Sequence, residues 1–148
     1  MTPQIEDPEV EQDLLHVMLV DDEDDYHLIT RMMLKKAGFR GRFSAFLDPD
    51  EAIAHLRESH EMPDLLLVDI NMPATDGFEF LSLCAHEHLL SPASTTVVMC
   101  SSSNRPMDME MAKQSVFISE YVEKPLSPDQ FNRIAEQHAR RQGSGKNQ

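Results

Sequence analysis

The chain has 148 residues, of which 41% are hydrophobic and 26% are charged, a size and composition typical of one globular domain. Lys and Arg number 13 against 26 Asp and Glu, which gives a formal net charge of −13 at pH 7. Because this charge repels nucleic acid phosphates and anionic lipids, the sequence favours neither nucleic acid nor a membrane as a partner.

The two ends of the chain differ in composition from the rest. Residues 1–13 hold five acidic residues, two prolines and no basic residue, which predicts a disordered acidic tail. They contain no apolar stretch like that of a secretion signal, so we expect a cytoplasmic protein. The polar residues 141–148 predict a flexible C-terminal tail, which leaves residues 14–140 as the folded domain.

Between these ends, apolar runs of strand length alternate with segments of helical period. The predicted strands are 14–20, 39–47, 65–70, 95–101 and 120–123, and the predicted helices are 24–36, 49–59, 77–89, 106–114 and 128–141. The runs LLLV and TTVVM lack polar alternation, which indicates strands covered by helices on both faces. The predicted fold class is therefore α/β, a five-stranded parallel sheet, doubly wound and flavodoxin-like, in three α/β/α layers.

Two of the predicted helices carry additional sequence signals. Leu28, Ile29, Met32 and Met33 repeat on one face of the first helix, and Gly38 follows it as a stop. The segment 127–130, Ser-Pro-Asp-Gln, has the pattern of a capping box with proline at the first helical position.

Polar residues follow four of the predicted strands. They are Asp21 and Asp22 after the first strand, Asp69 and Asn71 after the third, Ser101 and Ser102 after the fourth, and Lys124 after the fifth. Each pattern alone is common at turns and helix starts. Because parallel strands bring their carboxyl ends to one edge of the sheet, the four together indicate a functional site.

The chemistry of this site follows from its charges. Asp21, Asp22 and Asp69 would repel one another, and a hard divalent cation relieves that repulsion. Oxygen ligands favour Mg²⁺, with Mn²⁺ as the alternative, over zinc. A cation beside Lys124, with the Ser101 hydroxyl as a further donor, suits a phosphoryl group, and Asp69 is the natural nucleophile.

The motifs MLVDDEDD, LLLVDINMPATDGFEFL, VVMCSSS and YVEKP resemble, in this order and spacing, the receiver domain of two-component response regulators. The resemblance covers residues 14–140 and is greatest to single-domain, chemotaxis-type (CheY-like) members. It implies a non-enzymatic signalling protein in which Asp69 accepts a phosphoryl group from a histidine kinase or a histidine phosphotransfer protein.

The resemblance also implies roles for the residues around the acceptor. Asp22, Asp69 and the backbone carbonyl of Asn71 would bind Mg²⁺, with Asp21 acting directly or through water. The resemblance implies that Lys124 pairs with a phosphate oxygen and that its peptide bond to Pro125 is cis. It also implies that Ser101 supplies the switch hydroxyl, that the Ser102 amide is a further donor, and that Tyr121 is the aromatic switch residue.

The chain contains no effector segment, so the output would be a protein partner. The resemblance places that partner on the face formed by the segments 106–114, 120–123 and 128–141. Met107, Met109 and Met111 are spaced by two, so a regular helix cannot bury all three. We expect either that some of these methionines are exposed and face a partner, or that the helix is locally unwound. Phe117 and Ile118, where receivers usually have small residues, are expected in the core, with a docking or dimer surface as the alternative.

Other functions and properties stay open. A phosphorelay intermediate or phosphate sink would use the same residues, and a pseudo-receiver is disfavoured because all the acidic, hydroxyl and lysine positions are filled. A Mg²⁺-dependent phosphohydrolase is less favoured, because such an enzyme needs a second acid to protonate the leaving group and Asn71 occupies that position. The small polar residues Asn71 and Ser103 predict a short-lived phosphoryl group, while the cognate kinase, the pathway and the choice between monomer and homodimer are undetermined.

Overall fold

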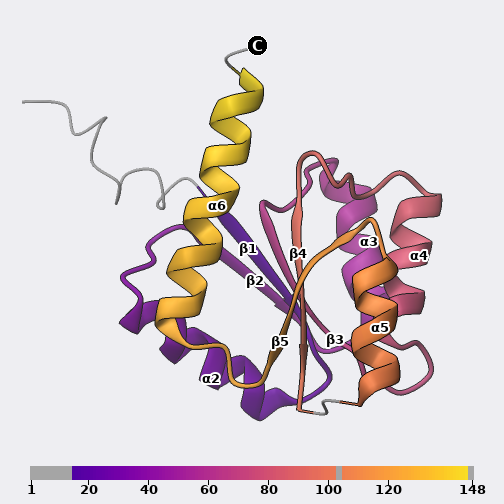
Figure 1. Ribbon diagram of the computed structural model, residues 1–148. Helices are drawn as coiled ribbons and strands as arrows, with labels where there is room; N and C mark the ends of the chain where they lie inside the picture. The colour runs from indigo at the N-terminus through magenta and orange to yellow at the C-terminus, as the bar shows by residue number, and fades with distance from the viewer. Residues whose placement is uncertain (1–14, 103–104, 147–148) are drawn as a thin grey trace, which may run out of the picture.

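Five parallel strands form one sheet in the order β2-β1-β3-β4-β5 (Figure 1). The structure is a computed structural model that describes residues 15–102 and 105–146. In chain order the elements are β1 (His16–Val20), α2 (Asp24–Lys36), β2 (Arg42–Phe46), α3 (Pro49–Ser59), β3 (Leu65–Asp69), α4 (Gly77–His86), β4 (Thr96–Ser101), α5 (Pro106–Gln114), β5 (Ile118–Glu123) and α6 (Pro128–Lys146). The predicted fold class, a doubly wound parallel sheet, is confirmed.

The helices cover both faces of the sheet and give the fold its three layers. Helices α2 and α6 lie on one face, and α3, α4 and α5 lie on the other (Figure 1). Because both faces are covered, every residue of β1, β3 and β4 is buried, which explains their continuous apolar sequences. Within the described residues, none of the helices combines the length and the hydropathy needed to cross a membrane.

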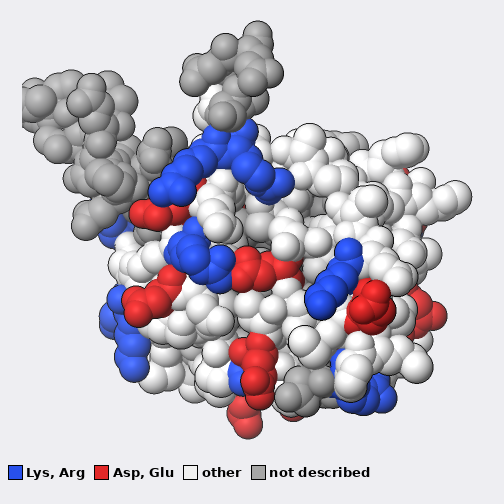
Figure 2. All heavy atoms as spheres, viewed as in Figure 1, with Lys and Arg blue, Asp and Glu red and all other residues white. Residues whose placement is uncertain are grey.

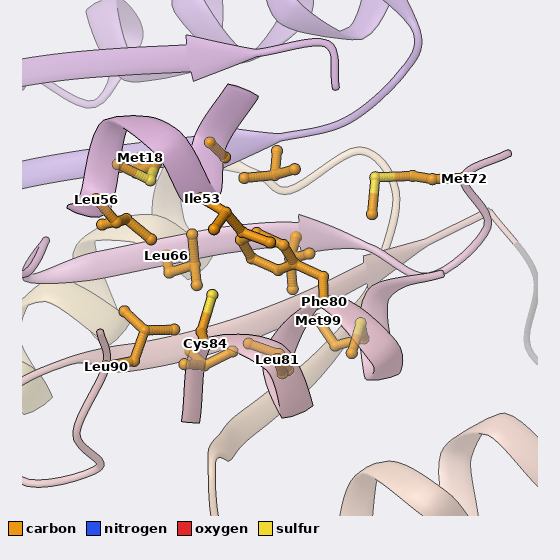
Figure 3. Close-up of a cluster of buried hydrophobic side chains, with 14 of the residues drawn as sticks. Met18, Ile53, Leu56, Leu66, Met72, Phe80, Leu81, Cys84, Leu90 and Met99 are labelled. Carbon is orange, nitrogen blue, oxygen red and sulfur yellow. The ribbon is translucent and has the colours of Figure 1, made fainter. Parts of the chain in front are cut away.

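Side chains alternate between two hydrophobic clusters along each central strand. Figure 3 shows the cluster on the α3 and α4 side, where Met18, Leu66 and Met99 of the sheet pack with Leu56 of α3 and Phe80 of α4. The neighbouring strand residues point to the second cluster, between the sheet and the helices α2 and α6. The sheet is therefore fixed from both sides, and its carboxyl edge is a rigid platform.

Two predicted helix ends are wrong. Helix α4 ends at His86 and not at Leu89, because His88 adopts a left-handed φ of 60° and the amides of His88 and Leu89 donate to Ala85 and Cys84 in a Schellman motif. Helix α6 runs through Lys146, so residues 141–146 of the predicted tail are helical. The tail residues 1–13 and 147–148 lie outside the described residues.

Helix α2 does not turn its most apolar stripe toward the sheet. Leu28, Ile29 and Met32 are 60%, 44% and 53% exposed, whereas Met33 is buried. The buried face also carries Tyr26, His27, Thr30 and Leu34, so two polar side chains take places that hydrophobic ones could fill. Packing of Tyr26 and Leu34 in the second hydrophobic cluster fixes the rotation of the helix. Gly38 follows the helix with a φ of 84°, which suits the predicted stop.

Candidate functional site

The carboxyl ends of β1, β3 and β5 bring acidic and basic side chains together. Asp21 and Asp22 follow β1, Asp69 is the last residue of β3, and Lys124 follows β5. Carboxylate oxygens of Asp21, Asp22 and Asp69 lie within 4.8 Å of one another. This edge of the sheet is the lower edge in Figure 1, and Figure 2 shows acidic side chains gathered there.

Lys124 lies within this cluster and offsets part of its negative charge. Its Nζ lies 2.7 Å from Oδ2 of Asp21, 3.4 Å from Oδ1 of Asp69 and 3.3 Å from Oε1 of Glu23. The side chain of Lys124 is only 8% exposed and those of Asp21 and Asp69 are buried, so water screens the pairs of Lys124 with these two carboxylates weakly. The peptide bond between Lys124 and Pro125 is cis, and the Lys124 amide donates to the Ser101 carbonyl at 2.9 Å.

The charges perturb both groups that would handle a phosphoryl group. Burial, together with the negative charge of Asp21, raises the pKa of Asp69 from 3.8 to about 6, although Lys124 and the backbone amide of Asn71 oppose the rise. Burial alone would lower the pKa of Lys124, but its hydrogen bond to Asp21 and the charges of Asp21 and Asp69 outweigh burial and raise it. Lys124 therefore stays an ammonium at neutral pH.

The donor set fits a hard divalent cation. Three carboxylates face one ammonium, so the Asp21, Asp22, Asp69 and Lys124 side chains carry excess negative charge when all are ionised. All three candidate ligands offer oxygen atoms, which Mg²⁺ and Mn²⁺ prefer. The elevated pKa of Asp69 is consistent with this fit, because a bound cation would favour its charged form.

The remaining predicted residues lie around this cluster. Ser101 is buried at the end of β4, Ser102 follows it at the surface, and Asn71 is exposed two residues beyond Asp69. Tyr121 is half-buried on β5 and packs against the hydrophobic cluster of α3 and α4. Ser103 lies outside the described residues, so the structure leaves its predicted role open.

The structure adds three residues that the sequence analysis did not assign to the site. The side chain of Glu23, the residue before α2, pairs with Lys124, while Asp24 and Asp25 occupy the first turn of the helix. The ring of Tyr26 lies beside the ammonium of Lys124. Gly77 packs against the backbone of Asp69. The sequence held only one signal that Glu23 and Tyr26 belong to the site, namely their short spacing from Asp22.

Gly77 is needed for the close approach of α4 to the end of β3. A Cβ atom at Gly77 would lie 2.4 Å from the carbonyl oxygen of Asp69, and the amide of Gly77 donates to the carbonyl of Ile70 at 2.8 Å. We expect Gly77→Ala to lower the free energy of unfolding by roughly 1–3 kcal/mol and to displace Asp69. Urea denaturation measures the loss.

Gly143→Ala is the matched control, because a Cβ atom at Gly143 in α6 has no neighbour within 4 Å. This substitution is expected to leave stability unchanged or to raise it by up to about 1 kcal/mol, since alanine is the better helix former. Equal effects of the two substitutions would contradict the steric role of Gly77.

The doubly wound sheet and the acidic carboxyl edge define an α/β protein of the flavodoxin-like class, in which ligands bind beyond the ends of the strands. Residues 17–136 match the family model of the response regulator receiver domain. The chain belongs to this family.

Proteins similar to this chain include two curated regulators. It is 28% identical over 131 residues to a probable methanogenesis regulatory protein, FilR2, of Methanothrix harundinacea, covering 85% of this chain and 82% of that protein. It is 29% identical over 123 residues to the protein PilG of Pseudomonas aeruginosa, covering 83% of this chain and 86% of that protein.

The fold is also similar to that of solved structures. A two-component response regulator from Cytophaga hutchinsonii superimposes with a TM-score of 0.80 at 24% identity, covering 86% of this chain and 98% of that structure. This similarity supports the fold, and the family assignment rests on the sequence match.

Proposed function

We propose that the protein is a single-domain response regulator that accepts a phosphoryl group on Asp69 and then changes its binding to a protein partner. The observation that carries the proposal is the convergence of Asp21, Asp22 and Asp69 with the ammonium of Lys124 at one edge of the sheet. Membership of the receiver domain family supports it.

The proposed donor is a phosphohistidine of a histidine kinase or of a histidine phosphotransfer protein, and the proposed location is therefore the cytoplasm. A carboxylate oxygen of Asp69 attacks the phosphorus atom, and the bond from phosphorus to the donor imidazole nitrogen breaks. That nitrogen keeps the electron pair, and Asp69 becomes an acyl phosphate. The ammonium of Lys124, already 3.4 Å from Asp69, offsets the negative charge of the transferred group.

Asp22, Asp69 and the backbone carbonyl of Asn71 are the proposed ligands of Mg²⁺ or Mn²⁺, with Asp21 acting directly or through water. When bound, the cation offsets charge on the phosphoryl oxygens. Asp21 has a second role in this arrangement, because its carboxylate holds Lys124 at 2.7 Å and so fixes the ammonium beside the acceptor.

The proposed switch starts at Ser101 and Ser102. Phosphorylation adds nearly two negative charges, so the Ser101 hydroxyl and the Ser102 amide gain by moving toward the new oxygens, and Tyr121 turns into the vacated space. The proposed output face comprises α5, β5 and α6. Its exposed methionines support this choice, since Met107 is 74% and Met111 is 44% exposed on a helix that is fully wound.

A phosphorelay intermediate would use the same chemistry and would pass the group on to a histidine. A pull-down with phosphorylated and unphosphorylated protein separates the two, because a terminal regulator retains a partner in only one state. A phosphohydrolase is the weaker alternative, since the side-chain amide of Asn71 cannot protonate a leaving group.

Intact mass spectrometry after incubation with acetyl phosphate and Mg²⁺ tests the proposal. The mass should rise by one phosphoryl group, and Asp69→Asn should abolish the gain. Asp25→Asn, at an exposed acid in the first turn of α2, is the control and should keep the gain. A gain that persists in Asp69→Asn, or no gain in the unmodified chain, would refute the assignment.

A further inference from the structure

Tyr26 lies between the acceptor site and the turn that follows β5. We propose that Tyr26 is a positioning residue, whose ring holds the Lys124 ammonium and whose hydroxyl holds the turn at Leu126. The inference rests on the proposed function, because it concerns the lysine that would face the phosphoryl group. Tyr26 sits in the first half of α2, and the turn between β5 and α6 passes beside that helix (Figure 1).

The first observation is the contact between the ring and the ammonium. Nζ of Lys124 lies 4.4 Å from the centroid of the Tyr26 ring, which is within the range of a cation–π interaction. Tyr26 is 6% exposed and the Lys124 side chain is 8% exposed. Little water competes for the ammonium in such a place, so the contact is stronger than it would be at the surface.

The second observation is the hydrogen bond made by the phenol. The amide of Leu126 donates to the hydroxyl of Tyr26 at 3.3 Å, and both residues are buried. Because Leu126 is only two residues beyond Lys124, one side chain holds both the head of the lysine and the backbone that carries it. This link joins residues 100 positions apart in the sequence.

The ring does something that the acidic neighbours of Lys124 cannot do. An ammonium has three N–H donors, and Asp21, Glu23 and Asp69 all lie within 3.4 Å of Nζ. An arriving phosphoryl oxygen must take over a donor from one of these carboxylates. The ring attracts the ammonium through its face and accepts no N–H bond from it, so it keeps Nζ in place during that exchange.

Three substitutions separate the two contacts of Tyr26. Tyr26→Phe keeps the ring and removes the hydroxyl, whereas Tyr26→Leu removes both. Tyr26→Met fills the same space with an unbranched apolar chain and serves if the leucine variant does not fold. Each is made in the full chain with Lys124 and again with Lys124→Ala, which gives a double-mutant cycle.

The rate of mass gain is measured at saturating Mg²⁺ over a range of acetyl phosphate concentrations. We expect Tyr26→Phe to keep the maximal rate within about threefold and Tyr26→Leu or Tyr26→Met to lower it about tenfold, because only the ring faces the ammonium. In the Lys124→Ala background, Tyr26→Leu should cause no further loss. A buried tyrosine with a purely structural role would lower the rate equally in both backgrounds.

Three results would overturn the inference. They are a rate for Tyr26→Leu equal to that of the unmodified chain, equal losses for Tyr26→Phe and Tyr26→Leu, and an undiminished effect of Tyr26→Leu in the Lys124→Ala background.

A measurement without phosphorylation separates this inference from the proposed function. A ring 4.4 Å from Nζ should shift the NMR signals of the Lys124 ε-methylene protons upfield. The shift should persist in Tyr26→Phe and vanish in Tyr26→Leu. If the unmodified chain gains no mass but shows this pattern, the proposed function fails and the placement of Lys124 by Tyr26 holds; if the shift is missing, the placement itself is refuted.

Discussion

Lys124→Ala is expected to lower the free energy of unfolding of the metal-free protein by about 3 kcal/mol. The substitution removes the ammonium that lies 2.7 Å from Asp21 and 3.4 Å from Asp69, and it leaves two buried carboxylates facing each other. Removing one partner of a buried ion pair costs more than the pair contributes, because the remaining charge has neither water nor a counterion.

Urea denaturation with and without Mg²⁺ measures this effect. A bound cation takes over part of the neutralisation, so the loss caused by Lys124→Ala should shrink when Mg²⁺ is present. Lys113→Ala, at an exposed lysine in α5, is the control and should change stability by less than about 0.5 kcal/mol. Equal losses for the two lysines, or a loss independent of Mg²⁺, would contradict the proposed electrostatic role of Lys124.

The fold was predictable because its signals are local and repeated. The runs at 65–68 and 95–99 lack polar alternation, which indicates strands covered on both faces, and strands of that kind need intervening helices. The capping box also formed as predicted, since the amides of Ser127 and Gln130 each donate a hydrogen bond to the other residue's side chain.

The acidic cluster was predictable for a related reason. Asp21, Asp22, Asp69 and Lys124 come directly at the ends of strands, and the topology alone brings strand ends together. The exposure of the methionines in α5 also follows from spacing, because residues two positions apart cannot share one face of a helix. Asp108 and Ala112 are the buried residues of this helix instead.

Contacts that depend on the rotation of a helix were not predictable. The stripe of Leu28, Ile29 and Met32 is more apolar than the face that α2 buries, and packing in the second cluster decided the outcome. The same rotation brings Tyr26 to Lys124. The length of α6 was missed because the residues that follow Arg140 are polar or glycine, and the prediction took this composition as the end of the helix.

Asp69→Asn is expected to raise the free energy of unfolding of the metal-free protein by about 2 kcal/mol at pH 7. The pKa of Asp69 rises from 3.8 to about 6 because of burial and the charge of Asp21. Ionised Asp69 therefore destabilises the fold. A pKa rise of this size corresponds to a destabilisation of the folded protein by at most about 3 kcal/mol, and relaxation of Asp21 and Lys124 around the site reduces this destabilisation.

The pH dependence has a definite sign. For a carboxyl group whose pKa is raised in the folded state, the penalty is complete above the folded value, near pH 6, and disappears below the unfolded value, near 3.8. The stability gained through Asp69→Asn should therefore be constant above about pH 6.5 and should vanish as the pH falls toward about 3.5. Titrating groups that do not interact with Asp69 are the same in both proteins and cancel in the difference.

Paired urea denaturation curves of the two proteins between pH 3.5 and about 7.5 measure this difference directly. Asp25→Asn serves again as the control, and it should give no gain that depends on pH in this window. Saturating Mg²⁺ should cancel or reverse the advantage of Asp69→Asn, because the cation stabilises only the chain that keeps all three carboxylates. A gain that grows as the pH falls would mean that Asp69 is stabilised in its charged form, and the electrostatic description of the acceptor site would be wrong.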